Sequence, residues 1–407
     1  MKAYLILEDG TVFEGTHIGA DREVISEIVF NTSMAGYLEV LTDPSYAGQA
    51  VCMTYPLIGN YGICRDDCEA LRPWPDGFIV RELSRTPSNF RCDCTIQQYL
   101  EENNIPGISG IDTRALTRIL REKGTMNGMI TADKNYDLEK ILPEIKKYTT
   151  GKVVEKVSCK EKYVVPPVLS PAENGPLSGA ARFDREAWEK GIREPRPALI
   201  RELNGTGLRV ALMDFGAKAN IARSLAGRGC EVTVYPGLTP AEEIIEARPH
   251  GIMLSNGPGD PKECDFIIKQ IRELYETDIP IFAICLGHQL MALATGADTY
   301  KMKYGHRGGN HPVKDLMTGR VYISSQNHGY VVDVKGLDPK VAVPAFVNVN
   351  DGTNEGLSYT GKNIFTVQFH PEACPGPQDS GYLFDRFIGM MKGETEDLRE
   401  KGGCRNA

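Results

Sequence analysis

The strongest constraint on the fold is a regular alternation of strand-like and helix-like segments that begins near Gly207. Apolar segments with strand character occupy residues 208–215, 230–237, 250–257 and 279–284. The segments between these strands repeat apolar residues at helical spacing; they are 220–230, 239–247 and 265–277. A further helix is expected from about Gly287. Such alternation is typical of a parallel sheet covered by helices on both faces. We therefore predict an α/β fold whose C-terminal domain is a doubly wound, mostly parallel sheet.

The remaining segments suggest other kinds of sheet. Residues 319–329, 354–361 and 363–371 are extended and rich in turns, which predicts an antiparallel edge added to the parallel sheet. The first 150 residues are β-rich with interspersed helices. There, Asp9-Gly10 between two strand-like runs predicts a hairpin. Asp112 is expected to cap a helix that ends at Gly124.

These patterns divide the chain into four predicted segments. A smaller, β-rich α/β N-terminal domain covers 1–150, a linker covers 151–207, the α/β domain covers 208–392, and a loose tail covers 393–407. The linker is rich in proline and glycine over 164–179 and charged over 185–197, where one short helix is expected. A length of 407 residues is consistent with two or three domains.

Composition excludes several classes of protein. The net charge of −8 leaves no surplus of cations to neutralise phosphates, which argues against nucleic acid as a main partner. No stretch approaches the ~20 apolar residues that span a bilayer, and the N-terminus lacks a signal-peptide profile. The eleven cysteines are an odd number and read as reduced thiols. We expect a cytoplasmic protein with no membrane association.

One cysteine, Cys285, lies where a predicted strand meets a helix. It could be a buried core residue, half of a redox pair, a metal ligand or a nucleophile. At the carboxyl end of a strand in an open α/β sheet, a side chain is presented to ligands. The first turn of the following helix favours a thiolate, and Gly287 permits a tight turn. Cys285 alone does not decide between these roles.

A base and an orienting carboxylate are available for such a nucleophile. His370 ends the strand-like run 363–371, on the same sheet edge as Cys285 if that strand joins the sheet in parallel. Glu372 lies two positions further on and could accept a hydrogen bond from the imidazole. The loop 255–261 could present backbone N–H groups as an oxyanion hole. Each feature alone also fits an ordinary turn.

Phosphate and metal motifs are weak. The run 356–363 has Walker A spacing but ends in Asn363 and precedes a strand rather than a helix. No other nucleotide fingerprint is present, so this chain is not expected to handle ATP. Cysteine and histidine pairs close in sequence do not form two matching knuckles, so no metal site is predicted; these pairs are Cys64 and Cys68, Cys92 and Cys94, and His306 and His311.

Three motifs in order carry a resemblance. The C-L-G-H-Q elbow at Cys285, the upstream N-G-P-G-D-P loop and the downstream H-P-E resemble the triad-type class I glutamine amidotransferases over about 210–391. Near the N-terminus, FNTSMAGYLEVLTDPSYAGQ, TYPLIGNYG and DTRALTRILREKG are similar to the N-terminal domain of carbamoyl phosphate synthetase small subunits, as are KMKYGHRGGNHPVKD and SSQNHGY. Tyr330 stands where that family often has Phe.

The resemblance implies a mechanism and a site. Cys285 would attack the side-chain amide of L-glutamine, His370 would move protons, and Glu372 would orient His370. It also places residues around the glutamine, with the Gly259 and Leu286 backbones on the oxyanion; the full set is Ser45, Gly257, Gly259, Leu286, Gln289, Asn327, Gly329 and Tyr330.

The implied assembly is a hetero-oligomer. Ammonia would pass through a sheltered tunnel to a large synthetase subunit, which would use bicarbonate, ATP and Mg²⁺ to make carbamoyl phosphate for arginine or pyrimidine biosynthesis. No cofactor is expected in this chain. Three alternatives remain: an amidotransferase subunit of another synthase, a non-catalytic scaffold with the same fold, and a cysteine protease or redox protein on a similar fold. The last would be expected to lack the glutamine-loop motifs and the N-terminal domain. The scaffold would be expected to lack the nucleophile or the base, and both are present.

Overall fold

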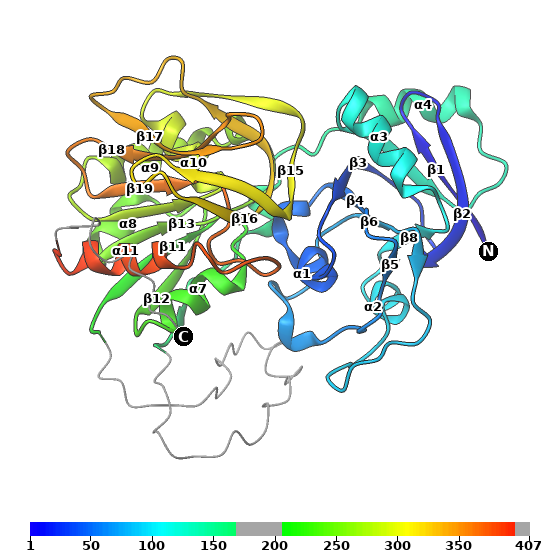
Figure 1. Ribbon diagram of the computed structural model, residues 1–407, viewed down its shortest axis with the longest axis horizontal. Helices are drawn as coiled ribbons and strands as arrows, with labels where there is room; N and C mark the ends of the chain where they lie inside the picture. The colour runs from blue at the N-terminus through cyan, green and yellow to red at the C-terminus, as the bar shows by residue number, and fades with distance from the viewer. Residues whose placement is uncertain (168–205, 395–407) are drawn as a thin grey trace.

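The computed structural model describes residues 1–167 and 206–394, and it folds into two lobes that lie side by side (Figure 1). The N-terminal lobe is a closed barrel with strand order β1-β2-β8-β6-β4-β3-β9. Its strands are β1 (Lys2–Leu7), β2 (Val12–Gly19), β3 (Val24–Asn31), β4 (Gln49–Met53), β6 (Gly77–Ile79), β8 (Pro106–Ser109) and β9 (Met126–Thr131). A separate parallel pair joins β5 (Leu57–Ile58) to β7 (Glu82–Leu83).

Helices and short 3-10 turns surround the barrel. They are α1 (Tyr37–Thr42), η1 (Pro44–Tyr46), η2 (Arg65–Asp67), α2 (Ile96–Glu102), α3 (Thr113–Lys123) and α4 (Leu138–Lys147). The short helix α5 (Val154–Val157) follows them in the chain. Two local predictions are confirmed. β1 and β2 form the antiparallel hairpin around Asp9-Gly10, with Gly10 at φ 86°. α3 begins after Asp112, whose side chain accepts a hydrogen bond from Ala115 N at 3.0 Å, and it ends at Gly124.

The C-terminal lobe is built on one ten-stranded sheet of order β10-β12-β11-β13-β14-β19-β18-β17-β15-β16. Five neighbouring strands run parallel: β12 (Glu231–Pro236), β11 (Arg209–Asp214), β13 (Gly251–Leu254), β14 (Ile281–Ile284) and β19 (Ile364–Val367). The antiparallel extension consists of β18 (Asn354–Tyr359), β17 (Ala342–Asn348), β15 (Asp298–Asp315) and β16 (Val321–Asp333). The expected antiparallel edge is therefore present.

Both faces of the parallel strands are buried. Met213 and Leu254 face one apolar cluster, which includes residues of α8 (Ala241–Glu246), α9 (Asp265–Tyr275) and α10 (Leu286–Ala294). Leu212 and Met253 face the other, with residues of α7 (Ala219–Ala226) and α11 (Tyr382–Met391). Alternate residues of one strand thus lie on opposite faces, as strand geometry requires. The 3-10 turn η3 (Pro261–Glu263) follows β13. The predicted α/β class is confirmed. The prediction of a mostly parallel sheet is wrong for the sheet as a whole, because among the described residues four neighbouring strand pairs are parallel and five are antiparallel.

Part of the predicted linker belongs to the C-terminal sheet, so the prediction of a linker over 151–207 is wrong for that part. β10 (Tyr163–Val165) pairs antiparallel with β12, and Val154 of α5 is buried in the first apolar cluster. A three-residue strand is too short to show alternation, and the prolines that follow it suggested irregular chain. The short helix expected over 185–197 and nearly all of the predicted tail lie outside the described residues.

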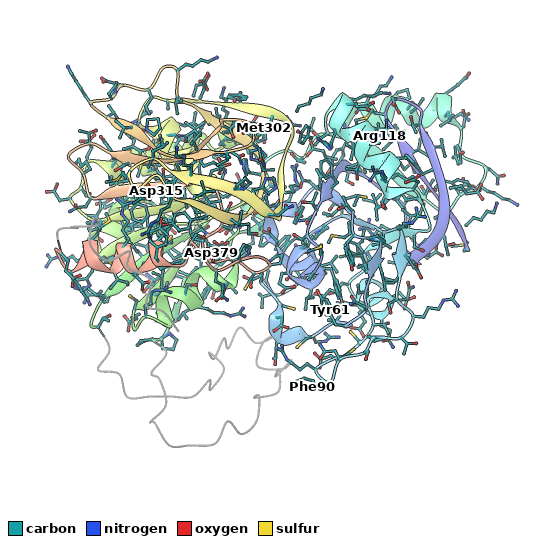
Figure 2. All side chains as sticks on the ribbon, viewed as in Figure 1. Tyr61, Phe90, Arg118, Met302, Asp315 and Asp379 are labelled. Atoms are coloured by element: carbon teal, nitrogen blue, oxygen red, sulfur yellow. The ribbon has the colours of Figure 1, made fainter. Side chains whose placement is uncertain are left out.

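The two lobes meet along β15, where side chains of both lobes contact one another (Figure 2). Lys301 Nζ lies 2.7 Å from Glu27 Oε1, and Thr125 N donates to Lys303 O at 2.9 Å. Thr32 N donates to Arg307 O at 3.2 Å. These contacts fix the antiparallel extension of the sheet against the barrel. Within the described residues, every helix is too short or too polar to cross a bilayer.

Candidate active site

Cys285 occupies a strained turn between β14 and α10. Its backbone has φ 52° and ψ −104°, a region that non-glycine residues rarely adopt and that recurs at functional sites. Its N–H donates to Val367 O at 2.8 Å, and its side chain is buried. A Cβ at Gly287 would lie 2.5 Å from Leu254 O, so the tight turn requires glycine there. This strand–turn–helix geometry is the one used to present nucleophiles in α/β hydrolases.

The base lies on the neighbouring strand end. β19 runs parallel to β14 with Ile284 opposite Val367, so His370 and Cys285 share one edge of the sheet, as expected. His370 Nδ1 donates to Glu372 Oε1 at 2.6 Å, and both side chains are buried. His370 Nε2 makes no hydrogen bond of ordinary geometry among the described residues. Since Nδ1 is occupied by Glu372, Nε2 is the nitrogen available to the thiol.

Electrostatics favour a charged pair at the base. Burial alone would raise the pKa of Glu372, but Lys218 and His370 outweigh it and lower that pKa to about 2. Burial alone would lower the pKa of His370, but Glu372 and Cys285 outweigh it and raise that pKa to about 10. An imidazolium held between a carboxylate and a thiol can donate a proton to a leaving group.

A buried lysine completes this arrangement, and the sequence analysis missed it. Lys218 Nζ lies 3.1 Å from Glu372 Oε1 and donates to Ala373 O at 2.5 Å. Only 2% of Lys218 is exposed, and the nearby carboxylates raise its pKa against the opposing effect of burial. Lys218 follows the carboxyl end of a predicted strand, a position where polar residues deserve scrutiny in α/β sheets. It prevents Glu372 from being a buried, uncompensated anion.

A cavity of about 410 Å³ opens beside Cys285, within the range of about 300–1,000 Å³ that is common for ligand sites. It lies at the junction of the lobes, near Met302 in Figure 2. Residues of both lobes line it. Seven of the eight predicted glutamine contacts do so: Ser45, Gly257, Gly259, Gln289, Asn327, Gly329 and Tyr330. Leu286 is not among the lining residues; its side chain is in the core, which leaves only its backbone for the predicted role.

Two polar contacts tie the N-terminal lobe to the cavity wall. Ser45 Oγ accepts from Asn256 Nδ2 at 2.9 Å, and Asp43 Oδ2 accepts from Asn327 Nδ2 at 2.8 Å. Asp43 was not predicted, because nothing in its local pattern distinguishes it from a capping residue. It also accepts from Ser45 N at 2.9 Å, which orders the η1 turn. The cavity is therefore complete only when the two lobes are together.

The predicted oxyanion loop has a close-packed backbone. A Cβ at Gly257 would lie 2.2 Å from Phe215 O, and Gly259 has φ 92°, so both positions require glycine. Ser255 Oγ accepts from Phe215 N at 2.9 Å, which fixes the start of the loop. On the facing helix, Gln289 Nε2 donates to Tyr330 O at 2.8 Å. These contacts make the cavity wall rigid.

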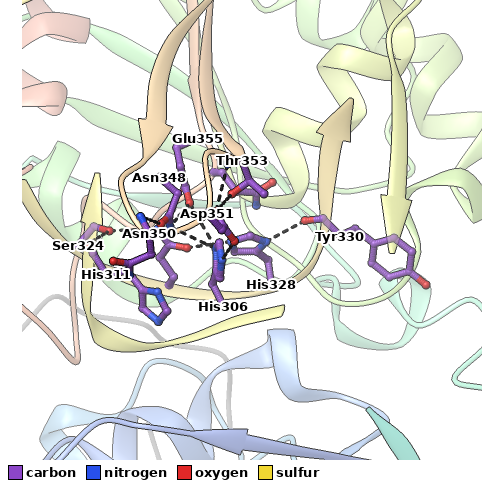
Figure 3. A network of polar contacts seen from close by, with 12 residues as sticks. His306, His311, Ser324, His328, Tyr330, Asn348, Asn350, Asp351, Thr353 and Glu355 are labelled. Carbon is purple, nitrogen blue, oxygen red and sulfur yellow. Dashed lines mark hydrogen bonds and ion pairs between the residues drawn. The ribbon is translucent and has the colours of Figure 1, made fainter. Parts of the chain in front are cut away.

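A second polar cluster lies on the backbone side of Tyr330, away from its ring (Figure 3). One ligand atom from each of His306, His328 and Glu355 lies within 4.8 Å of the others, a spacing that could hold a metal ion. His306 is already paired, however, with Asp351 Oδ2 at 2.8 Å and Glu355 Oε1 at 3.4 Å. Against the effect of burial, these carboxylates raise the pKa of His306 to about 9.

The cluster therefore already contains a cation without a metal. A His306 imidazolium supplies the cation between two carboxylates, and a metal ion would have to displace its proton. His328 Nδ1 lies 2.8 Å from Tyr330 O, so the cluster supports the strand that forms one wall of the cavity. We interpret the cluster as a structural ion network.

Comparison with known proteins agrees with this geometry. The family model for class I glutamine amidotransferases matches residues 211–390, so the C-terminal lobe is an amidotransferase domain of that class. The model for the carbamoyl-phosphate synthase small chain, CPSase domain, matches residues 5–130. A carbamoyl phosphate synthase small chain from Clostridium perfringens is 47% identical over 95% of this chain and 99% of the relative. The chain belongs to the family of carbamoyl phosphate synthase small chains.

Further relatives cover the chain similarly. A carbamoyl phosphate synthase small chain from Oceanobacillus iheyensis is 47% identical over 96% of both chains. Among solved structures, a glutamine amidotransferase from Thermotoga maritima is 20% identical, covering 48% of this chain and 86% of that chain with a TM-score of 0.34, too low to support an argument.

Proposed function

We propose that this chain hydrolyses L-glutamine at Cys285. The thiolate attacks the carboxamide carbon, and the charge that develops on its oxygen is held by the backbone N–H groups of Gly259 and Leu286. The His370 imidazolium gives its proton to the amide nitrogen, the C–N bond breaks, and ammonia departs. A γ-glutamyl thioester remains on Cys285. His370 then takes a proton from water, which attacks the thioester to release glutamate and restore the thiolate. Glu372 orients His370 throughout.

Glutamine recognition in this proposal depends on the cavity wall. Ser45, Gly257, Gln289, Asn327, Gly329 and Tyr330 surround the zwitterionic end of the substrate. A site built from such polar groups rejects a ligand that leaves them unpaired, so simple amides are expected to be poor substrates. Tyr330, where the family often has Phe, adds only a hydroxyl group, which is a small change if the backbone of this residue makes the contact.

The ammonia released here is used by a partner subunit. As in its family, the chain is the glutaminase component of a two-subunit synthetase, and ammonia passes through a sheltered path to a large subunit. That subunit makes carbamoyl phosphate from bicarbonate with ATP and Mg²⁺, so this chain carries no cofactor and the working enzyme is a hetero-oligomer. We further propose that residues 1–150 and 208–392 are separate domains and that residues 393–407 form a tail.

The observation that carries the proposal is the hydrogen-bonded pair of His370 and Glu372 at the same sheet edge as the strained Cys285. The test is release of glutamate and ammonia from glutamine by the complex and by the chain alone, with the parent and with Cys285→Ala. The complex should be more active than the chain alone, and the variant should be inactive in both. Equal glutaminase activity of parent and variant would refute the proposal.

A further inference from the structure

Glu69 reaches from the N-terminal lobe into the start of α7 in the C-terminal lobe. Asn220 N donates to Glu69 Oε2 at 2.9 Å, and Ala219 N donates to Glu69 O at 2.8 Å. The N-cap residue of α7, Lys218, makes no side-chain capping bond. Glu69 therefore supplies the cap of a helix in the other lobe, and its charge lies at the positive end of the helix dipole.

Glu69 is itself firmly held on the N-terminal side. Its backbone N–H donates to Thr42 Oγ1 at 2.9 Å at the end of α1, and only 2% of the residue is exposed. Arg223, a surface residue of α7, approaches Glu69 Oε1 at 3.7 Å with almost half of its own side chain exposed. Burial raises the pKa of Glu69 to about 7, against the attraction of the buried Lys218 and the weaker attraction of Arg223, so Glu69 is fully charged only above that pH.

The same turn of helix holds the catalytic carboxylate. Lys218 Nζ lies 3.1 Å from Glu372 Oε1, and Asn220 Nδ2 donates to Glu372 O. Lys218 thus contacts Glu372 and is also attracted, at longer range, by Glu69 and Asp43. Asn220 is hydrogen-bonded to both Glu69 and Glu372. A shift of Glu69 would move the helix start and change how strongly Lys218 is drawn to Glu372. The orientation of His370 depends on Glu372.

We propose that Glu69 is a positioning residue for the glutaminase reaction. Glu69 caps α7 and attracts Lys218, so the geometry of Glu372 depends on how the N-terminal lobe packs against the C-terminal lobe. This rests on the proposed function. It gives the N-terminal lobe a role beyond lining the cavity, because movement of that lobe would alter the base as well as the substrate pocket. Contacts of this kind, with two sites biasing one shared element, are what coupling between lobes requires.

The test uses two variants of Glu69 in the complex. Glu69→Gln keeps an acceptor for Asn220 N but removes the charge, whereas Glu69→Ala removes both. At about pH 8.5, where Glu69 is charged, Glu69→Gln should lower kcat for glutamine hydrolysis by about tenfold while KM changes less than about twofold, if the charge positions the base. Glu69→Ala should lower kcat further. Alkylation of Cys285 by a chloroketone analogue of glutamine should slow in the same order.

Arg223→Gln is the matched control. It removes the surface cation near Glu69 and leaves Lys218 in place, so kcat should stay within about twofold of the parent. Thermal unfolding separates folding from positioning, since Glu69→Gln should unfold near the parent temperature. A kcat for Glu69→Gln within twofold of the parent would overturn the inference. That result together with an inactive Cys285→Ala variant would leave the proposed function intact.

Discussion

Replacing Glu372 with Gln removes the negative charge that lies between the buried cations of His370 and Lys218. Glu372 accepts from His370 at 2.6 Å and lies 3.1 Å from Lys218, and all three side chains are buried. A rise in the pKa of His370 from 6.5 to about 10 corresponds to a preference on the order of 5 kcal/mol for the charged imidazole. With a neutral amide at position 372, burial should dominate and lower that pKa below 6.5.

The amide can also face Nδ1 with its NH₂ group, which would favour the wrong tautomer of His370. We therefore expect Glu372→Gln to lower kcat by about 10³–10⁴-fold. Lys218 would lose its closest partner but keep the attraction of Glu69, so the loss of unfolding free energy should fall near the low end of about 3–5 kcal/mol for a broken buried pair.

The assays are steady-state glutaminase kinetics across pH and denaturant unfolding. Glu243→Gln is the matched control, because Glu243 pairs with Lys162 at an exposed site at 2.9 Å. It should cost less than about 1 kcal/mol and leave kcat unchanged. A kcat for Glu372→Gln within tenfold of the parent would refute the assignment of Glu372 as the residue that orients the base.

Three further changes test other parts of the account. Gly287→Ala should place a Cβ against Leu254 O, lower stability by about 1–3 kcal/mol in denaturant unfolding and reduce kcat. Ser45→Ala should leave the buried amide of Asn256 without its acceptor and raise KM for glutamine by about five- to a hundredfold, measured with the complex. His306 has a pKa raised to about 9, so the stability it contributes is full below about pH 6.5 and is lost as pH rises through about 9. His306→Gln should weaken that fall in unfolding free energy between pH 6.5 and 9.5; an unchanged pH dependence would contradict the ion network.

The placement of Cys285, His370 and Glu372 was predictable because the signals for it are local. Cys285 follows an apolar run and precedes a glycine-bearing helix start, and the H-P-E motif ends another strand. Strand–helix alternation then implies that both strand ends lie at one edge of a sheet, which the parallel pairing of β14 with β19 confirms. Periodicity and order along the chain were sufficient to place these residues at one sheet edge, whereas their catalytic roles were implied by the family resemblance.

Contacts between distant segments were not predictable in this way. Glu69 meets Asn220 across 151 positions, and Asp43 meets Asn327 across 284. Each looks like an ordinary polar residue in its own segment, because its role depends on how a barrel seats against a separate sheet. The same reason hid Lys218, whose sequence neighbours do not include Glu372. The three-residue strand β10 was missed because pairing with β12, rather than local pattern, makes it a strand.

The central claim is that Cys285 is the nucleophile for glutamine, and covalent labelling tests it most directly. The chain is incubated with a chloroketone analogue of glutamine, with and without excess glutamine, and the modified residue is located by mass spectrometry in the parent and in Cys285→Ala. The account predicts one adduct, on Cys285, that glutamine suppresses and that the variant lacks. An adduct that persists in Cys285→Ala, or that forms on another cysteine of the parent in preference to Cys285, would contradict it.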